Sequence, residues 1–266
     1  MVRQPMELDR VGVQAVIASE VHTDDPEVLR RILTHTEALL LDFDGPVCSV
    51  FAGTPAHFIA MKLREVLADG GHTDLPVEVE KTEDPFAVFH YSSVLGLDTA
   101  RRVEAALRAY EVEAVTTADP TSHSHELMSR WHATGRPLAI VSNNSASAVQ
   151  MYLQRHGLAS HVQYVSARTE PNPCLLKPSP HLIRSAASKL NARVDACTLL
   201  GDSPSDVVGA RAAEAKVIGF ANKPHKIEAL REVRPDMIIQ SLQQCIEGVI
   251  NIIAATRRAG DNPDSS

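Results

Sequence analysis

Four aspartates follow two short apolar runs in this chain, and their side chains suit metal and phosphate chemistry. Asp42 and Asp44 come at the end of the run ALLLDFD, and Asp202 and Asp206 follow the run CTLLG. Two like charges about 4 Å apart repel by about 4 kcal/mol at an effective dielectric near 20. A cluster of these carboxylates therefore needs cations nearby, and a metal ion that prefers oxygen ligands would supply part of that charge.

Further polar residues follow other apolar runs and complete an anion-binding pattern. Ser142 and Asn143 end the run LAIVSN, and Lys177 lies in a loop just before a predicted helix. The Ser142 hydroxyl and the backbone N–H groups after it can donate to phosphate oxygens near a helix start. Each residue also has a simpler explanation: an aspartate in a turn, a serine that caps a helix, or a lysine in solvent.

The elements that must position these residues alternate between strands and helices. The predicted strands are 38–43, 138–142, 162–166, 197–201, 216–220 and 237–240. The predicted helices between the later strands are 145–156, 180–190, 205–213 and 226–233. Continuous apolar strands separated by helices predict an α/β fold with a doubly wound parallel sheet. In such sheets, ligands bind beyond the carboxyl ends of the strands, which is where the polar residues fall.

About ninety residues separate the first predicted strand from the second, far more than one crossover helix needs. Helical patterns occur within this stretch at 56–67, 85–95, 99–110 and 122–134. We expect the last to join the α/β core, formed by residues 1–52 and 117–258. The others predict a small helical domain over residues 53–116, inserted after the first strand. Residues 259–266 (AGDNPDSS) predict a disordered tail.

Composition and net charge limit the classes of partner that the chain is expected to bind. The formal net charge of the 266 residues is -7, and no Lys/Arg-rich run predicts nucleic-acid binding. No apolar run approaches the length of a membrane span, and the first residues lack the apolar stretch of a signal peptide. The four cysteines form no CxxC pair, which argues against a zinc site or a disulfide framework. We therefore expect a cytoplasmic protein, either a monomer or a homodimer.

Two smaller features each have a structural and a chemical interpretation. Cys48 follows the first aspartate pair closely and is either a reactive thiol or a small buried side chain. His123 and His125 form part of the segment SHSH, which suits either a metal site or the start of a helix. The N-terminal segment, residues 1–35, predicts an amphipathic helix that packs on its own core or joins a larger assembly.

Taken in order, the segments that hold these polar residues resemble the four sequence motifs of the haloacid dehalogenase (HAD) superfamily. The similarity covers residues 39–49 and 137–224, and the stretch GDSPSDVVGARAAEAKVIGFANKP is similar to phosphoglycolate-phosphatase-like members. The resemblance implies a Rossmann-like core with a helical cap. It also implies a Mg²⁺-dependent phosphatase that acts on a small phosphorylated metabolite, through an aspartyl-phosphate intermediate.

The resemblance also implies roles for individual residues. Asp42 matches the nucleophile, and Asp44 matches the general acid and base. The residues that match phosphate-binding positions are Gly45, Ser142, Asn143 and Lys177. Lys177 also matches a catalytic position, as the cation that neutralises the phosphoryl group during transfer. The residues that match Mg²⁺-binding positions are Asp42, Asp44 through its backbone carbonyl, Asp202 and Asp206, the last as a ligand or as a partner that orients the ligands.

Two alternatives stay open at this point. A phosphomutase of the same superfamily uses the same aspartates and passes the phosphoryl group to a second hydroxyl. A catalytically silent binding or regulatory protein keeps the fold but is expected to lose some of these residues. Haloacid dehalogenation is disfavoured, because those enzymes lack the second aspartate, which is present here as Asp44.

Overall fold

The computed structural model describes residues 21–260 and contains a six-stranded parallel sheet with the strand order β5–β4–β1–β6–β7–β8. The strands are β1 (Ala38–Leu41), β4 (Leu138–Ser145), β5 (Tyr164–Arg168), β6 (Cys197–Gly201), β7 (Lys216–Phe220) and β8 (Met237–Ile239). All six predicted strands are present, and the predicted fold class is confirmed. The first strand ends two residues earlier than predicted, although the Asp42 N–H still donates to the Leu200 carbonyl at 2.9 Å.

Both faces of the sheet are covered, which explains why most residues of its strands are apolar. Successive side chains of β1 face opposite layers: Leu39 and Leu41 pack in one core, and Ala38 and Leu40 pack in the other. One core receives side chains from α1 (Pro26–Thr34), α6 (Ser124–His132), α7 (Ala146–Arg155) and α11 (Leu242–Gly260). The other receives side chains from α8 (His181–Lys189), α9 (Pro204–Ala213) and α10 (Pro224–Val233).

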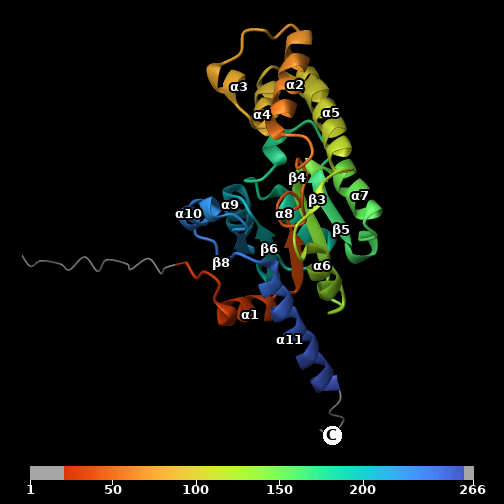
Figure 1. The fold of residues 1–266 in the computed structure, drawn as a ribbon, viewed down its shortest axis with the longest axis vertical. Helices are drawn as coiled ribbons and strands as arrows, with labels where there is room; N and C mark the ends of the chain where they lie inside the picture. Colours follow the sequence, from red (N-terminus) through yellow and green to blue (C-terminus); the bar gives the residue numbers. More distant parts are fainter. Residues whose placement is uncertain (1–20, 261–266) are drawn as a thin grey trace, which may run out of the picture.

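The long stretch after β1 forms four helices, which lie together at one end of the structure in Figure 1. They are α2 (Ala56–Asp69), α3 (Val77–Lys81), α4 (Pro85–Val94) and α5 (Leu97–Ala114). The chain leaves the core through β2 (Cys48–Ser49) and returns through β3 (Asp119–Pro120), and these two strands pair antiparallel. The exit and the return of the chain therefore lie side by side.

Two helices were not predicted from the sequence. Helix α3 lies between the predicted helices 56–67 and 85–95, where a short helix follows Pro76 as its N-cap and buries only Val79. Helix α11 is long and packs Leu242, Ile246 and Val249 against the core. It continues through Gly260, so the predicted tail at 259 begins too early. The rest of that tail, like residues 1–20, lies outside the described residues.

The helix predicted near the start of the chain is present as α1. The Asp25 carboxylate accepts hydrogen bonds from the backbone N–H groups of Glu27 and Val28, as an N-cap residue does. Leu29 and Leu33 of α1 pack in the same core as α11. Across residues 21–260, none of the helices combines the length and the apolar character needed to cross a membrane.

Candidate active site

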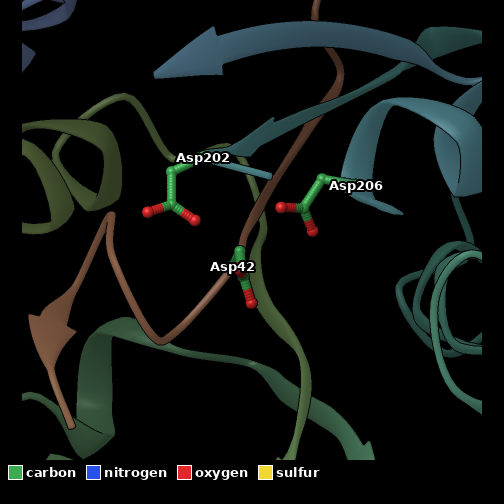
Figure 2. Close-up of side chains that lie close together, drawn as sticks. All are labelled: Asp42, Asp202 and Asp206. Atoms are coloured by element: carbon green, nitrogen blue, oxygen red, sulfur yellow. The ribbon is translucent and has the colours of Figure 1, made fainter. Parts of the chain in front are cut away.

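The central strand β1 brings the predicted site residues together. It pairs with β4 on one side and β6 on the other, so the carboxyl ends of all three strands meet at one edge of the sheet. Figure 2 shows Asp42, Asp202 and Asp206 close to one another, and each offers an oxygen within 4.8 Å of the other two. A cavity of about 430 Å³ opens at this edge. Its lining includes Asp42, Asp44, Gly45, Phe86, Asn143, Asn144, Lys177, Asp202, Lys223 and Lys226.

Lys177 lies at the centre of the carboxylates. Its ammonium nitrogen is 2.7 Å from Asp42 Oδ1 and 2.6 Å from Asp206 Oδ1, and it also donates to the Val141 carbonyl at 2.9 Å. Asp42 Oδ1 additionally accepts from the Phe43 N–H at 2.7 Å. Within the described residues, the second oxygen of Asp42, Oδ2, accepts no hydrogen bond. One oxygen of Asp42 is thus held in place while the other is available to react.

The electrostatics of the cluster favour an additional cation. Burial and the negative charge of Asp206 raise the pKa of Asp42 well above its ordinary value, although Lys177 opposes the rise. Burial alone would lower the pKa of Lys177, but Asp206 and Asp42 together raise it above its ordinary value. Burial also raises the pKa of Asp202. The carboxylates therefore lack sufficient positive charge, and their hard oxygen donors fit a divalent ion such as Mg²⁺.

The pKa of the Asp44 carboxyl lies closer to neutral pH than that of an ordinary aspartate. Burial raises the pKa of its carboxyl to about 6, and the hydrogen bond from the Val50 N–H opposes part of that rise. The negative charge of Asp202 acts in the same direction as burial. A carboxyl with this pKa exchanges protons easily at the pH of most cells, which suits a general acid or base.

Gly45 allows the backbone to approach Asp202 closely. Its φ angle is +118°, and a Cβ built at this position would lie 2.1 Å from Asp202 Oδ2. The Gly45 N–H donates to the Cys48 carbonyl at 2.7 Å, and the Thr121 hydroxyl donates to the Gly45 carbonyl at 2.5 Å. Gly45 therefore has a clear structural role, and the role in phosphate binding stays a prediction.

Ser142 and Asn143 lie at a shift in the pairing of β4 with β5. The buried Ser142 hydroxyl donates to Asn144 Oδ1 and accepts from the Asn144 N–H, each at 3.1 Å. Asn143 uses both ends of its amide on Lys177: Nδ2 donates to the Lys177 carbonyl at 3.0 Å, and Oδ1 accepts from its N–H at 2.8 Å. These bonds fix the Lys177 backbone, and phosphate binding by either side chain stays a prediction.

Asp206 is fully buried and has several partners within the protein. Besides Lys177, it accepts hydrogen bonds from the N–H and the hydroxyl of Ser203, at 3.0 and 2.6 Å. The Ser203 side chain in turn caps α9, forming a reciprocal capping box with Asp206. Both carboxylate oxygens are thereby occupied. These contacts favour the interpretation of Asp206 as an orienting partner.

The sequence pattern did not identify Lys226 as a site residue. Its ammonium group forms an ion pair with Asp202 and is partly buried at the start of α10. Lys223 lines the same cavity from the N-cap position of that helix. The only signal in the sequence was the pair of lysines in ANKPHK, which by itself indicates a solvated helix start.

A buried ion-pair network was also missed, and it joins α5 to the end of β4. Arg168 donates to Glu111 through Nη1 at 3.1 Å and Nη2 at 2.7 Å, and to the Asn143 carbonyl at 2.8 Å. A second carboxylate, Glu104, lies 3.4 Å from Arg168 Nε. These charges are separated by 57 and 64 positions in the chain, so no local pattern could pair them.

The surroundings of Cys48 and of the histidine segment favour structural roles for these residues. Cys48 is buried, and burial raises the pKa of its thiol above the ordinary value, so the reactive-thiol interpretation is disfavoured. His123 pairs with the Ser122 hydroxyl at 3.0 Å, and His125 pairs with the Tyr152 hydroxyl at 2.9 Å. The aspartate trio is the one cluster of potential metal ligands found among the described residues.

Known proteins share both the sequence pattern and the fold. The family described as haloacid dehalogenase-like hydrolase matches residues 84–220. A phosphoglycolate phosphatase of Neisseria meningitidis is 25% identical over 237 residues, covering 83% of this chain and 97% of that protein. Another, from Photobacterium profundum, is 27% identical over 125 residues, covering 47% of this chain and only 53% of that protein.

A solved structure shows the same fold. The crystal structure of a predicted phosphatase from Clostridium acetobutylicum superposes with a TM-score of 0.62 at 16% identity, covering 80% of this chain and 98% of that one. The family match spans more than half of the 266 residues and includes Ser142, Lys177 and Asp202. The chain belongs to the haloacid dehalogenase-like hydrolase family.

Proposed function

We propose that this protein is a Mg²⁺-dependent phosphatase that hydrolyses a small phosphorylated metabolite through an aspartyl-phosphate on Asp42. One observation carries the proposal: Lys177 holds one oxygen of Asp42 at 2.7 Å, while the other oxygen has no hydrogen-bond partner within residues 21–260. A buried carboxylate with one free oxygen beside an ammonium group suits attack on a phosphoryl group, whose negative charge the ammonium partly neutralises.

The reaction has two steps. Asp42 Oδ2 attacks phosphorus, the bond to the leaving oxygen breaks, and the Asp44 carboxyl donates its proton to that oxygen. Asp44 then accepts a proton from a water molecule that attacks the phosphoryl group, which releases phosphate and restores Asp42. The pKa of about 6 supports both roles of Asp44, because the group can lose and regain its proton near neutral pH.

The metal site follows from the same carboxylates. Asp42, Asp202 and the backbone carbonyl of Asp44 would hold Mg²⁺, while Asp206 orients Lys177. When bound, the ion supplies positive charge that stabilises the phosphoryl group during transfer. Lys226 now pairs with Asp202, so this ammonium group competes with a metal for the same carboxylate.

The helical segment, residues 53–116, acts in this proposal as a cap over the cavity. Phe86 of α4 already lines the cavity together with Asp42 and Lys177, which supports that placement. A cap of this kind excludes water and selects the substrate. The segment 70–84 connects α2 to α4 and is the proposed region for discrimination between substrates. The active unit is a monomer or a homodimer.

The test is phosphate release from a panel of phosphorylated metabolites, with Mg²⁺ and with excess chelator. We expect metal-dependent turnover in the wild type and a loss of at least about 10³-fold in Asp42→Asn, because the nucleophile is removed. Asp195→Asn is a matched control, since this exposed carboxylate does not line the cavity and should keep full activity. Isomerised product without free phosphate would support a phosphomutase, and Mg²⁺ binding without turnover would support a silent binding protein.

A further inference from the structure

A second cavity adjoins the first at Asp44. It measures about 350 Å³, and its lining residues are Asp44, Phe51, Ala56, Glu83, Asp84, Pro85 and Phe86. Asp44 and Phe86 line both cavities, so the two spaces meet at these side chains. The nucleophile Asp42 and the phosphate-neutralising Lys177 belong only to the first cavity.

This arrangement separates the two halves of a phosphomonoester. The phosphoryl group must lie beside Asp42 and Lys177, in the first cavity. The leaving oxygen must lie within reach of the Asp44 proton, at the boundary between the two cavities. The substituent that this oxygen carries then extends into the second cavity. This step rests on the proposed function, because it uses Asp44 as the acid.

The lining of the second cavity indicates which substituent it can accept. Phe51 and Phe86 are both half-buried and contribute aromatic surface. Glu83 and Asp84 contribute carboxylates from the segment that leads into α4. Lys, Arg and His are absent from its lining residues. Aromatic faces and carboxylates attract organic cations, whereas a carboxylate in the ligand would be repelled by both acids.

The cationic side chains lie in the other cavity. Lys223 and Lys226 line the first cavity, near Asp202, and neither lines the second. The two cavities therefore differ in charge: the first holds groups that neutralise phosphate, and the second holds only acidic and apolar groups.

We propose that the second cavity selects a phosphomonoester whose leaving alcohol carries an amine, and that it disfavours a leaving group that carries a carboxylate. The amine binds between the aromatic rings and Glu83. The proposal differs from the substrate that names the relatives, because the leaving group of phosphoglycolate ends in a carboxylate.

Three small esters of similar length test this inference: O-phosphoethanolamine, propyl phosphate and 2-phosphoglycolate, each with Mg²⁺ at pH 7. The terminal groups are an ammonium, a methyl and a carboxylate. We expect kcat/KM to fall in that order, with at least about a tenfold difference between the first and the last, as electrostatic selection predicts. Phenyl phosphate serves as a general substrate that reports whether phosphatase activity is present at all.

Glu83→Gln isolates the charge of the second cavity. This variant should reduce the ratio of kcat/KM for O-phosphoethanolamine to that for 2-phosphoglycolate several-fold, with little change for propyl phosphate. Glu80→Gln is the matched control: it removes the same charge three residues away, from an exposed side chain that lines neither cavity. Asp84 is less suitable for substitution, because its carboxylate caps α4 through the Phe86 N–H at 2.8 Å.

The outcomes separate the two proposals. Hydrolysis of 2-phosphoglycolate at least as efficiently as propyl phosphate overturns the inference and assigns the carboxylate to Lys223 and Lys226. An unchanged ratio in Glu83→Gln, with normal turnover of phenyl phosphate, also overturns it. Absence of turnover with all four esters overturns the proposed function, and the inference is lost with it.

Discussion

The buried pair of Arg168 and Glu111 gives the sharpest prediction about stability. The Arg168 side chain is 1% exposed and the Glu111 side chain is 0% exposed, so water reaches neither charge. Removing one partner of such a pair leaves an uncompensated buried charge, which typically costs 3–5 kcal/mol. Arg168→Met removes the guanidinium partner of Glu111 while keeping much of the side-chain volume.

The surroundings of Glu111 set the size of the effect. After the substitution, Glu111 would still accept hydrogen bonds from the Ser145 N–H at 2.8 Å and Asn144 Nδ2 at 3.2 Å. These two donors compensate part of the charge, so we expect a loss near the lower limit, about 3 kcal/mol. A domain of roughly 150–250 residues loses about 2–4 °C in Tm per kcal/mol, which gives a Tm decrease of about 6–12 °C.

The assay is urea unfolding of the metal-free protein, followed by circular dichroism. Removing the charges of Arg168 and Glu111 together in Arg168→Met/Glu111→Leu should cost less than the sum of the two single variants, because Glu111 is then not left unpaired. Glu104 also loses Arg168 in every variant that lacks this arginine, but it keeps a contact with Arg108 at 3.8 Å. Arg130→Met is the control: its ion pair with Glu126 is about half exposed, so its loss should cost less than about 1 kcal/mol. A loss below about 1 kcal/mol in Arg168→Met, or strict additivity in the double variant, would refute this reasoning.

Three further predictions concern the site and the thiols. Burial raises the pKa of Asp44 from 3.8 to about 6, so the folded protein holds a proton there that the unfolded chain has lost. The stability that the protonated Asp44 contributes is complete below about pH 3.8 and is lost as the pH rises through 6. Asp44→Asn should therefore raise the unfolding free energy of the metal-free protein by up to about 3 kcal/mol at pH 7 and change it little at pH 4. Urea titrations at the two pH values measure this difference. If Mg²⁺ binds the folded state as proposed, it should raise the Tm of the wild type in a thermal melt, and an equal rise in Asp202→Asn would contradict the proposed metal site. Among the four cysteines, Cys174 is exposed and the others are buried. An aromatic disulfide reagent should therefore label one thiol rapidly in the native protein and all four only after unfolding. Rapid labelling of two or more thiols in the native protein would argue against the described packing.

Local patterns in the sequence were sufficient for the main elements. Largely apolar runs of four to six residues, separated by helical periodicity, predicted the six strands and a doubly wound sheet, because burial on both faces favours apolar side chains along the whole strand. The same argument placed Asp42, Asn143 and Asp202 at one edge, since parallel strands present their carboxyl ends together. Element ends were less accurate, as β1 shows by stopping at Leu41.

Only the tertiary structure decided which charges meet. Glu111 and Arg168 are 57 positions apart, and each by itself looks like an ordinary solvated charge on a helix or strand end. Lys226 joins Asp202 across 24 positions because α10 and β6 meet at the same edge of the sheet. Glu83 likewise acquires its place beside a cavity only when the helical segment folds back over the core. The periodicity of the sequence indicates which side chains are buried. The pairing of distant charges and the shape of a cavity depend instead on how the helices and strands pack against one another.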